Sequence, residues 1–184
     1  AVGLQGWFLT DEPNNLTKWE VPLVAPLGTN QQVLIYASGK DLVSPGGEMH
    51  TNFQIDSSGE YLALVKPDGV TIAAEFANPP NQREDVSYGI VDRNKRFFTT
   101  PTPNAPNNTG SLGFVADTTF SVDRGFYEEP IQVEISIDTD GAEIRYTLDG
   151  TWPGEGVGRR YTGAITIDST TTLRAVALKP GFSS

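Results

Sequence analysis

Residues 131–138 read IQVEISID, and this octapeptide decides the fold class. Isoleucine or valine stands at positions 131, 133, 135 and 137, and each is followed by a polar residue. Alternation with a period of two places the apolar side chains on one face of a β-strand. We therefore expect a strand here that buries one face and exposes the other.

Similar short runs recur along the chain, each closed by Gly, Pro, Asn or Asp, which is the pattern of an all-β protein. Pro67-Asp68-Gly69 lies between two of them and predicts a hairpin, because proline presets φ and Asp-Gly tolerates left-handed turn geometry. A single turn within 39–49 is the only helix that we expect. The expected strands are 4–10, 17–21, 32–37, 51–56, 60–66, 70–76, 86–90, 131–138, 142–148, 159–162, 164–168 and 171–178.

The composition changes between the two halves of this 184-residue chain. Residues 99–118 are rich in proline and asparagine, carry no charge before Asp117 and have few apolar residues, so we expect an extended connector. The predicted organisation is two tandem β-sandwiches, residues 1–98 and 119–184, joined by the linker 99–118. The predicted fold class is all-β.

Charge and reactive side chains restrict the function. With 13 Lys and Arg against 23 Asp and Glu, the formal net charge is −10, which argues against nucleic acid or an anionic membrane surface as partner. No cysteine and only one histidine are present, which excludes disulfides, thiolate nucleophiles and multi-histidine metal centres. The apolar runs are too short for insertion into a membrane.

The first half carries an ordered series of motifs that resembles the bacterial lamin-tail domain, over about residues 1–107. This resemblance implies an immunoglobulin-like sandwich that lacks its first strands, and Asn104 stands where the family usually has glycine. The matching segments are Leu4–Asp11 (LQGWFLTD), Leu16–Trp19 (LTKW), Tyr36–Asp41 (YASGKD), His50–Phe53 (HTNF), Gly59–Leu64 (GEYLAL), Asp85–Gly89 (DVSYG) and Pro101–Asn107 (PTPNAPN).

The second half is similar to the chitobiase/β-hexosaminidase C-terminal domain, a small fibronectin-III-like sandwich. The similarity rests on Ile144–Pro153 (IRYTLDGTWP), Tyr161–Ile167 (YTGAITI) and Thr171–Ala177 (TTLRAVA). Trp152 and the glycine-rich stretch 154–158 depart from the family pattern, and the last strand is expected to be missing. Both resemblances together imply an internal segment of a large exported protein of planctomycete-like bacteria.

Three aromatic residues of the second half are the candidate ligand-binding residues. Trp152 lies in a loop rich in Gly and Pro, off any strand pattern, and Tyr161 and Tyr146 complete a conceivable aromatic face for sugar. Trp7 and Trp19 are expected in the core instead, because apolar residues flank them. His50 is expected to close a loop by hydrogen bonding rather than to act in catalysis.

Acidic residues supply no specific site. Asp138-Thr139-Asp140-Gly141 begins like a calcium loop but lacks the closing glutamate, so a hairpin turn is the better interpretation. We predict no cofactor, with weak Ca²⁺ binding by acidic clusters left open. No combination of reactive side chains points to catalysis, and the resemblance of the second half is to an accessory module rather than to a catalytic barrel.

The predicted function is therefore non-catalytic. We expect a structural, spacer or adhesion segment of a larger extracellular or cell-surface bacterial protein, with the periplasm as the alternative location. Its partners would be other domains of the same polypeptide or other subunits, bound at β-sheet edges, because the missing end strands would leave edges unpaired. The alternative is a carbohydrate-binding accessory module of a secreted enzyme.

Overall fold

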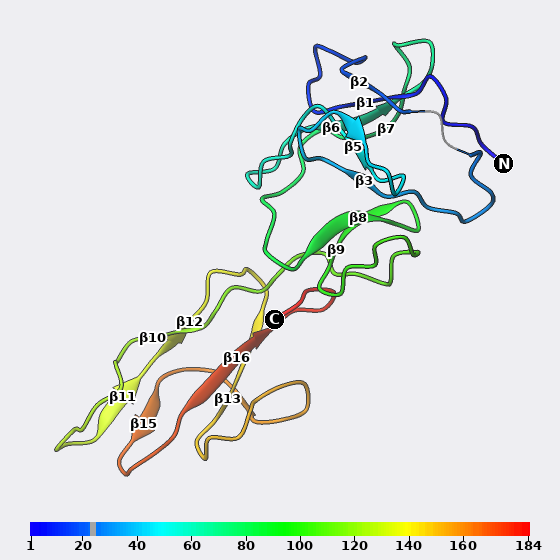
Figure 1. Ribbon diagram of the computed structural model, residues 1–184. Coiled ribbons are helices and arrows are strands. Elements are labelled where there is room, and N and C mark those ends of the chain that lie inside the picture. The colour runs from blue at the N-terminus through cyan, green and yellow to red at the C-terminus, as the bar shows by residue number, and fades with distance from the viewer. Residues whose placement is uncertain (23–24) are drawn as a thin grey trace. The chain divides into compact units, whose positions relative to one another are not determined.

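The computed structural model describes residues 1–22 and 25–184, and over these residues the fold is all-β, without helices. The chain forms two compact units (Figure 1). The first comprises Ala1–Asn94 and Phe98–Gly110, and the second comprises Lys95–Phe97 and Ser111–Ser184. The helical turn expected within 39–49 is wrong, because this segment forms two short strands joined by a turn.

Two sheets form the body of the first unit. Within the described residues, one sheet has the strand order β2-β1-β6-β7 and the other has the order β3-β5-β4. All neighbours are antiparallel except β3 and β5, which run parallel. The strands of the first sheet are β1 (Phe8–Thr10), β2 (Trp19–Glu20), β6 (Leu62–Val65) and β7 (Ile72–Phe76), and those of the second are β3 (Ile35–Tyr36), β4 (Leu42–Val43) and β5 (Met49–His50).

The core of the first unit lies between these two sheets. Trp19 of β2 and Met49 of β5 are both buried and belong to one hydrophobic cluster. Trp7 packs against the same cluster, which confirms the core placement expected for Trp7 and Trp19. Apolar side chains from both sheets thus close a sandwich, as the alternating strands of an antiparallel protein require.

Two hairpins show how turn chemistry sets the strand register. In the predicted hairpin between β6 and β7, Asp68 accepts hydrogen bonds from the N–H groups of Val70 and Thr71, and Gly69 has a φ of 71°. A second hairpin, which the sequence did not predict, joins β8 (Ser87–Val91) to β9 (Asn94–Phe98). Its turn residues Asp92 and Arg93 both have positive φ, a conformation usually taken by Asn-Gly.

The second unit consists of short antiparallel pairs. In the part of this unit that is described, the pairs are β10-β12 and β11-β15, beside a sheet of order β14-β13-β16. Their bounds are β10 (Thr119–Phe120), β11 (Ile131–Val133), β12 (Ile135–Ser136), β13 (Glu143–Thr147), β14 (Arg159–Arg160), β15 (Ile165–Ile167) and β16 (Arg174–Leu178).

The octapeptide 131–138 has the burial that its pattern predicts, with Val133 and Ile135 buried and the polar residues exposed. It is nevertheless two strands rather than one, because β11 pairs with β15 and β12 pairs with β10. The change of partner falls at Glu134, whose N–H donates to Ser121 Oγ at 2.8 Å. A single sequence run therefore serves two sheets.

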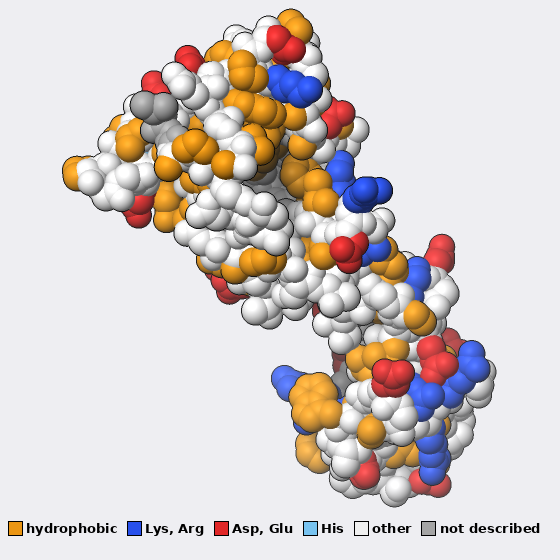
Figure 2. Space-filling model, turned by 90° about the vertical axis from the view of Figure 1, so that its right-hand side faces the viewer, with side chains coloured by type: hydrophobic (Ala, Val, Ile, Leu, Met, Phe, Trp, Pro, Cys, Tyr) orange, Lys and Arg blue, Asp and Glu red, His pale blue; other side chains and the backbone are white. Residues whose placement is uncertain are grey.

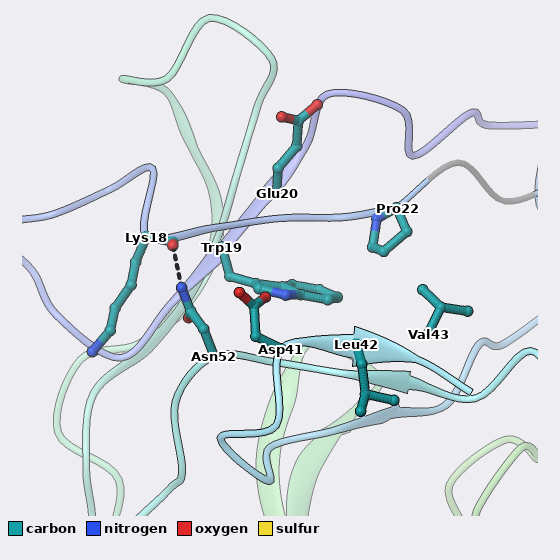
Figure 3. Close-up of a pocket in the computed structure, with 8 residues that line it drawn as sticks. All are labelled: Lys18, Trp19, Glu20, Pro22, Asp41, Leu42, Val43 and Asn52. Carbon is teal, nitrogen blue, oxygen red and sulfur yellow. Dashed lines mark hydrogen bonds between the residues drawn. The ribbon is translucent and has the colours of Figure 1, made fainter.

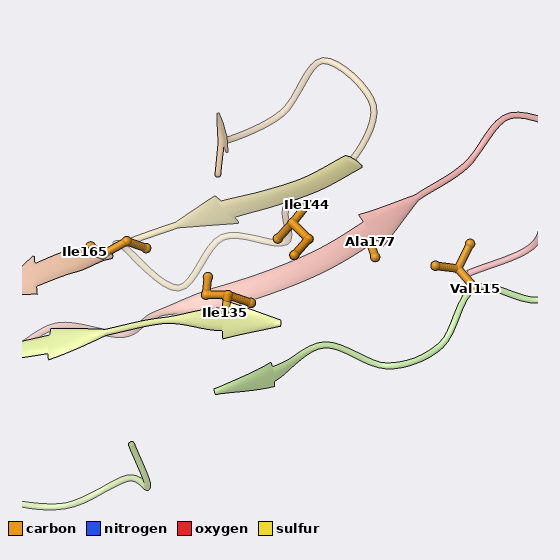
Figure 4. Packing of buried hydrophobic residues seen from close by; sticks show 5 residues of the cluster. All are labelled: Val115, Ile135, Ile144, Ile165 and Ala177. Carbon is orange, nitrogen blue, oxygen red and sulfur yellow. The ribbon is translucent and has the colours of Figure 1, made fainter. Parts of the chain in front are cut away.

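The core of the second unit draws one residue from each of four strands and one from the segment before β10, as Figure 4 shows. These residues are Val115, Ile135, Ile144, Ile165 and Ala177. Val115 belongs to the stretch 99–118 that was expected to be a connector, yet it is only 8% exposed. Its N–H donates to the carbonyl of Ser183, so hydrogen bonding and apolar burial both bring the end of that stretch into the second unit.

Candidate functional site

The loop after β13 presents Trp152 to solvent, with 78% of the residue exposed. Asp149 Oδ1 accepts hydrogen bonds from the N–H and the hydroxyl of Thr151, and Thr147 Oγ1 donates to the Thr151 carbonyl at 2.6 Å. The Thr151 hydroxyl is the main reason why the pKa of Asp149 lies below its ordinary value. Pro153, the next residue, is buried and anchors the loop.

Arg174 of β16 covers one face of this indole. Its guanidinium carbon lies 4.1 Å from the Trp152 ring centroid, which is a cation–π geometry. Arg174 Nε is buried and has no hydrogen-bond partner among the described residues. The loop and β16 thus form an exposed platform in which an aromatic ring and a guanidinium lie together.

Tyr146 and Tyr161 lie in the second unit as a different kind of pair. Their rings meet edge to face at 6.4 Å, and both pack against the hydrophobic core. Tyr161 Oη accepts a hydrogen bond from the N–H of buried Ile135 at 3.0 Å. The structure therefore brings Tyr146 and Tyr161 together, but as packing residues. Of the three predicted site residues, Trp152 is the exposed one.

His50 is held by its neighbours. Its Nδ1 lies 2.9 Å from Ser38 Oγ, and its ring stacks on Tyr36 at a centroid distance of 5.1 Å. Thr51, the next residue, is 1% exposed and donates to the Phe53 carbonyl at 2.6 Å. These contacts confirm the hydrogen-bonding role that the sequence predicts for the segment.

Acidic side chains do not gather into a metal-ligand cluster. Across the described residues, no group of three or more His, Cys, Asp or Glu side chains could hold a metal ion. The sequence 138–141 forms a turn in which Gly141 has a φ of 69°. The turn is not the expected hairpin, because it connects β12 and β13, which pair with other strands. On the face shown in Figure 2, acidic and basic side chains are interspersed rather than sorted by sign.

A groove of about 420 Å³ lies in the first unit, between β2 and β4 (Figure 3). Trp19, Asp41 and Val43 point into the space between the two strands. Glu20 and Leu42 point away from it on opposite sides. The full lining is Lys18, Trp19, Glu20, Pro22, Asp41, Leu42, Val43 and Asn52.

Lys18, at one end of this groove, is ion-paired on its own unit. Its Nζ lies 2.7 Å from Asp11 Oδ1 and 2.6 Å from Glu12 Oε1. Hydrogen bonds to these two carboxylates, Asp11 first, raise the pKa of Lys18 above its ordinary value. Because two carboxylates share this one ammonium, Lys18 brings no free positive charge to the groove, and the Asp41 carboxylate gives it an acidic character.

Comparison with known proteins gives one assignment, and it falls on the second unit. Residues 122–184 match the family model of the chitobiase/beta-hexosaminidase C-terminal domain. This segment is therefore similar to an accessory domain with an immunoglobulin/fibronectin-III-like fold, and the similarity is not to a catalytic domain. No curated protein and no solved structure matches the chain.

The match agrees with the similarity proposed for the second half on its YTLDG and YTGAITI motifs. In the described residues, no helix is long and apolar enough to cross a membrane. Sequence reasoning missed Arg174 as the partner of Trp152, and it missed the groove. A two-residue strand such as β4 leaves no periodic signal, so only the fold brings Val43 opposite Trp19.

Proposed function

We propose that the chain is a non-catalytic structural and adhesion segment of a larger extracellular or cell-surface bacterial protein, with a lamin-tail-like sandwich as its first unit. It acts through contacts with other proteins, made at the edges of its β-sheets. The proposed setting is an exported protein of the planctomycete-like kind.

The observation that carries this proposal is the match of residues 122–184 to an accessory domain of larger glycosidase-type proteins. The structure adds support, because each unit has its own hydrophobic cluster, around Trp19 in the first and around Ile135 in the second. Units with separate cores are suited to serve as modules in a longer polypeptide. Open sheets such as β2-β1-β6-β7 also have edge strands to which another chain can add a strand.

The test is a binding array that carries both strand-forming peptides and glycans, probed with the full 184-residue chain. The proposal expects peptides to be retained and glycans to pass unbound. Retention of glycans alone would overturn it. The affinity of the chain for each retained peptide or glycan is then measured in solution, with a heat-unfolded sample as the control for non-specific adhesion.

A second candidate function, the carbohydrate-binding accessory module, is favoured by one observation. Trp152 is 78% exposed, and only one face of its ring carries the Arg174 guanidinium. An exposed indole face can stack on a sugar ring, and the guanidinium can hydrogen-bond to hydroxyl or carboxylate groups. Loss of glycan retention in Trp152→Ala, with an unchanged fold, would support this candidate.

A further inference from the structure

In the part of the chain that the structure describes, the edge of β4 that borders the groove has unpaired backbone groups. The N–H of Ser44 donates to the carbonyl of Glu48 at 2.8 Å, and Leu42 pairs with His50 two residues earlier. Bonded positions alternate along an antiparallel pair, so Leu42 and Ser44 face β5 while the N–H and C=O of Val43 point away from it. Among the described residues, β4 pairs only with β5.

The opposite wall of the groove is the edge strand β2, which offers few backbone groups for pairing. The N–H of Val21 bonds to the carbonyl of Trp7, so the groups of Lys18 and Glu20 point to the free edge of β2. The carbonyl of Lys18 is already taken by Asn52 Nδ2 at 2.8 Å, and Pro22 has no N–H to offer. The backbone of β4 is limited in the same way, because the Asp41 N–H bonds to the Thr51 carbonyl and Pro45 has no N–H. The side chains decide between the two strands: Leu42 and Val43 are exposed and apolar and gain from being covered by a strand, whereas the outward residue of β2 is the charged Glu20.

Side chains along β4 define what such a strand would meet. Leu42 and Val43 are 44% and 50% exposed, although both are large and apolar. Val43 faces the groove together with Trp19, and Asp41 adds a carboxylate beside the indole (Figure 3). Lys40, which precedes Asp41, does not line the groove.

From this arrangement we infer that the groove binds an extended, cationic, β-branched peptide strand, which adds to β4 as a new edge strand. Its residue opposite Val43 packs on the exposed Val43 side chain, and a Lys or Arg faces Asp41. The acidic groove and the net charge of −10 favour a cationic strand over an acidic one. This inference rests on the proposed function and names the site and the partner chemistry for it.

The test uses the full chain and the peptide Ac-Lys-Thr-Val-Lys-Val-Thr-Lys-NH₂, with its Glu-for-Lys counterpart as the charge control. Amide hydrogen exchange is followed by NMR. The inference expects exchange of the Val43 N–H to slow on peptide binding, while Leu42 and Ser44, already bonded to β5, stay unchanged. Slowing at Glu20 instead, or no binding of the cationic peptide, overturns it.

Charge variants provide the second arm. Asp41→Lys and Asp41→Asn should each weaken peptide binding, with the charge reversal worth about threefold to tenfold. Glu155→Lys makes the same charge change at an exposed position of the second unit and should leave binding unchanged. Equal loss in all three variants would show a general charge effect and overturn the groove assignment.

Two further outcomes separate this inference from the function on which it rests. If the array retains peptides but Val43 is unaffected, the groove assignment fails and the adhesion proposal stands. If the array retains only glycans, the adhesion proposal itself fails. Self-association of the chain that protects Val43 without peptide would make a second copy the occupant and overturn the inference.

Discussion

The guanidinium carbon of Arg174 lies 4.1 Å from the centre of the Trp152 ring, and Trp152 is 78% exposed. Trp152 is thus held in place without being buried. The Asp149–Thr151 turn fixes the loop on one side, and β16 supplies the cation on the other. The indole therefore contributes little to the hydrophobic core and remains accessible to a ligand.

Replacement of Trp152 by alanine should cost little stability. An exposed cation–π contact is worth about 0.5–1 kcal/mol, so the free energy of unfolding of the second unit should fall by that amount. Urea unfolding followed by circular dichroism measures the change. Arg174→Lys, which keeps the charge but loses the planar stack, should give a similar loss. A loss above about 3 kcal/mol would mean that the indole is part of the core.

Replacement of Tyr161 by phenylalanine should cost more than its single oxygen suggests. The ring and its contact with Tyr146 remain, but the buried N–H of Ile135 loses its acceptor, which costs about 1–3 kcal/mol. Tyr127→Phe is the matched control, since the hydroxyl of Tyr127 donates to the Asp123 carbonyl at an exposed site. Equal effects of the two variants on urea unfolding would argue against the Tyr161 hydrogen bond.

Gly156 and Gly158, in the loop between β13 and β14, allow the cost of backbone strain to be distinguished from that of a steric clash. Gly158 and Gly156 both have positive φ, of 84° and 75°. A Cβ at Gly158 would lie 2.6 Å from the Tyr146 carbonyl oxygen, whereas a Cβ at Gly156 would meet nothing within 4 Å. Gly156→Ala should cost about 1–3 kcal/mol for the backbone alone, and Gly158→Ala should cost clearly more. Similar melting temperatures for the two variants would contradict this geometry.

The turn at Asp68 should make the first unit sensitive to acid. Hydrogen bonds from Thr71, its hydroxyl first, and from the Val70 N–H lower the pKa of Asp68 from 3.8 to about 2. Because the folded pKa lies below the unfolded one, this stabilisation is present above about pH 4 and is lost as the pH falls towards 2. A carbon-13 NMR titration of the carboxyl group measures this pKa.

The control for this prediction is Asp68→Asn, which keeps the Oδ1 acceptor but cannot titrate. Its free energy of unfolding should fall less than that of the unmodified chain between pH 4 and 2. If the free energies of unfolding of the two proteins fall by the same amount between pH 4 and 2, the ionised Asp68 carboxylate does not stabilise the turn.

Much of the fold can be predicted from local patterns. The alternation at 131–138 gives the buried face, and Pro67-Asp68-Gly69 gives a hairpin, because both signals lie within a few residues. The β8–β9 hairpin was missed, since Asp92 and Arg93 adopt a turn conformation that usually requires Asn-Gly. Val115 was assigned to a connector because the residues that it contacts, the core residues Ile135 and Ile144 and the Ser183 carbonyl, are distant in sequence.

The candidate sites also divide into features that a local pattern predicts and features that depend on residues distant in sequence. The exposure of Trp152 could be predicted from its Gly- and Pro-rich loop. The packing role of Tyr161 could not, because its hydroxyl accepts a hydrogen bond from Ile135, which lies in a strand distant in sequence. The groove depends on Trp19 and Val43 meeting across two sheets, and no local pattern encodes that meeting.

A single NMR titration tests the central claim, that the chain binds a protein strand at a sheet edge, most directly. The full chain receives the cationic peptide and a mixture of glycans in turn, and the Val43 amide and the Trp152 indole N–H signals are followed together. The account predicts that the peptide shifts the Val43 signal and that the glycans shift neither. A glycan-induced shift of the Trp152 indole, with Val43 unmoved by the peptide, would contradict it.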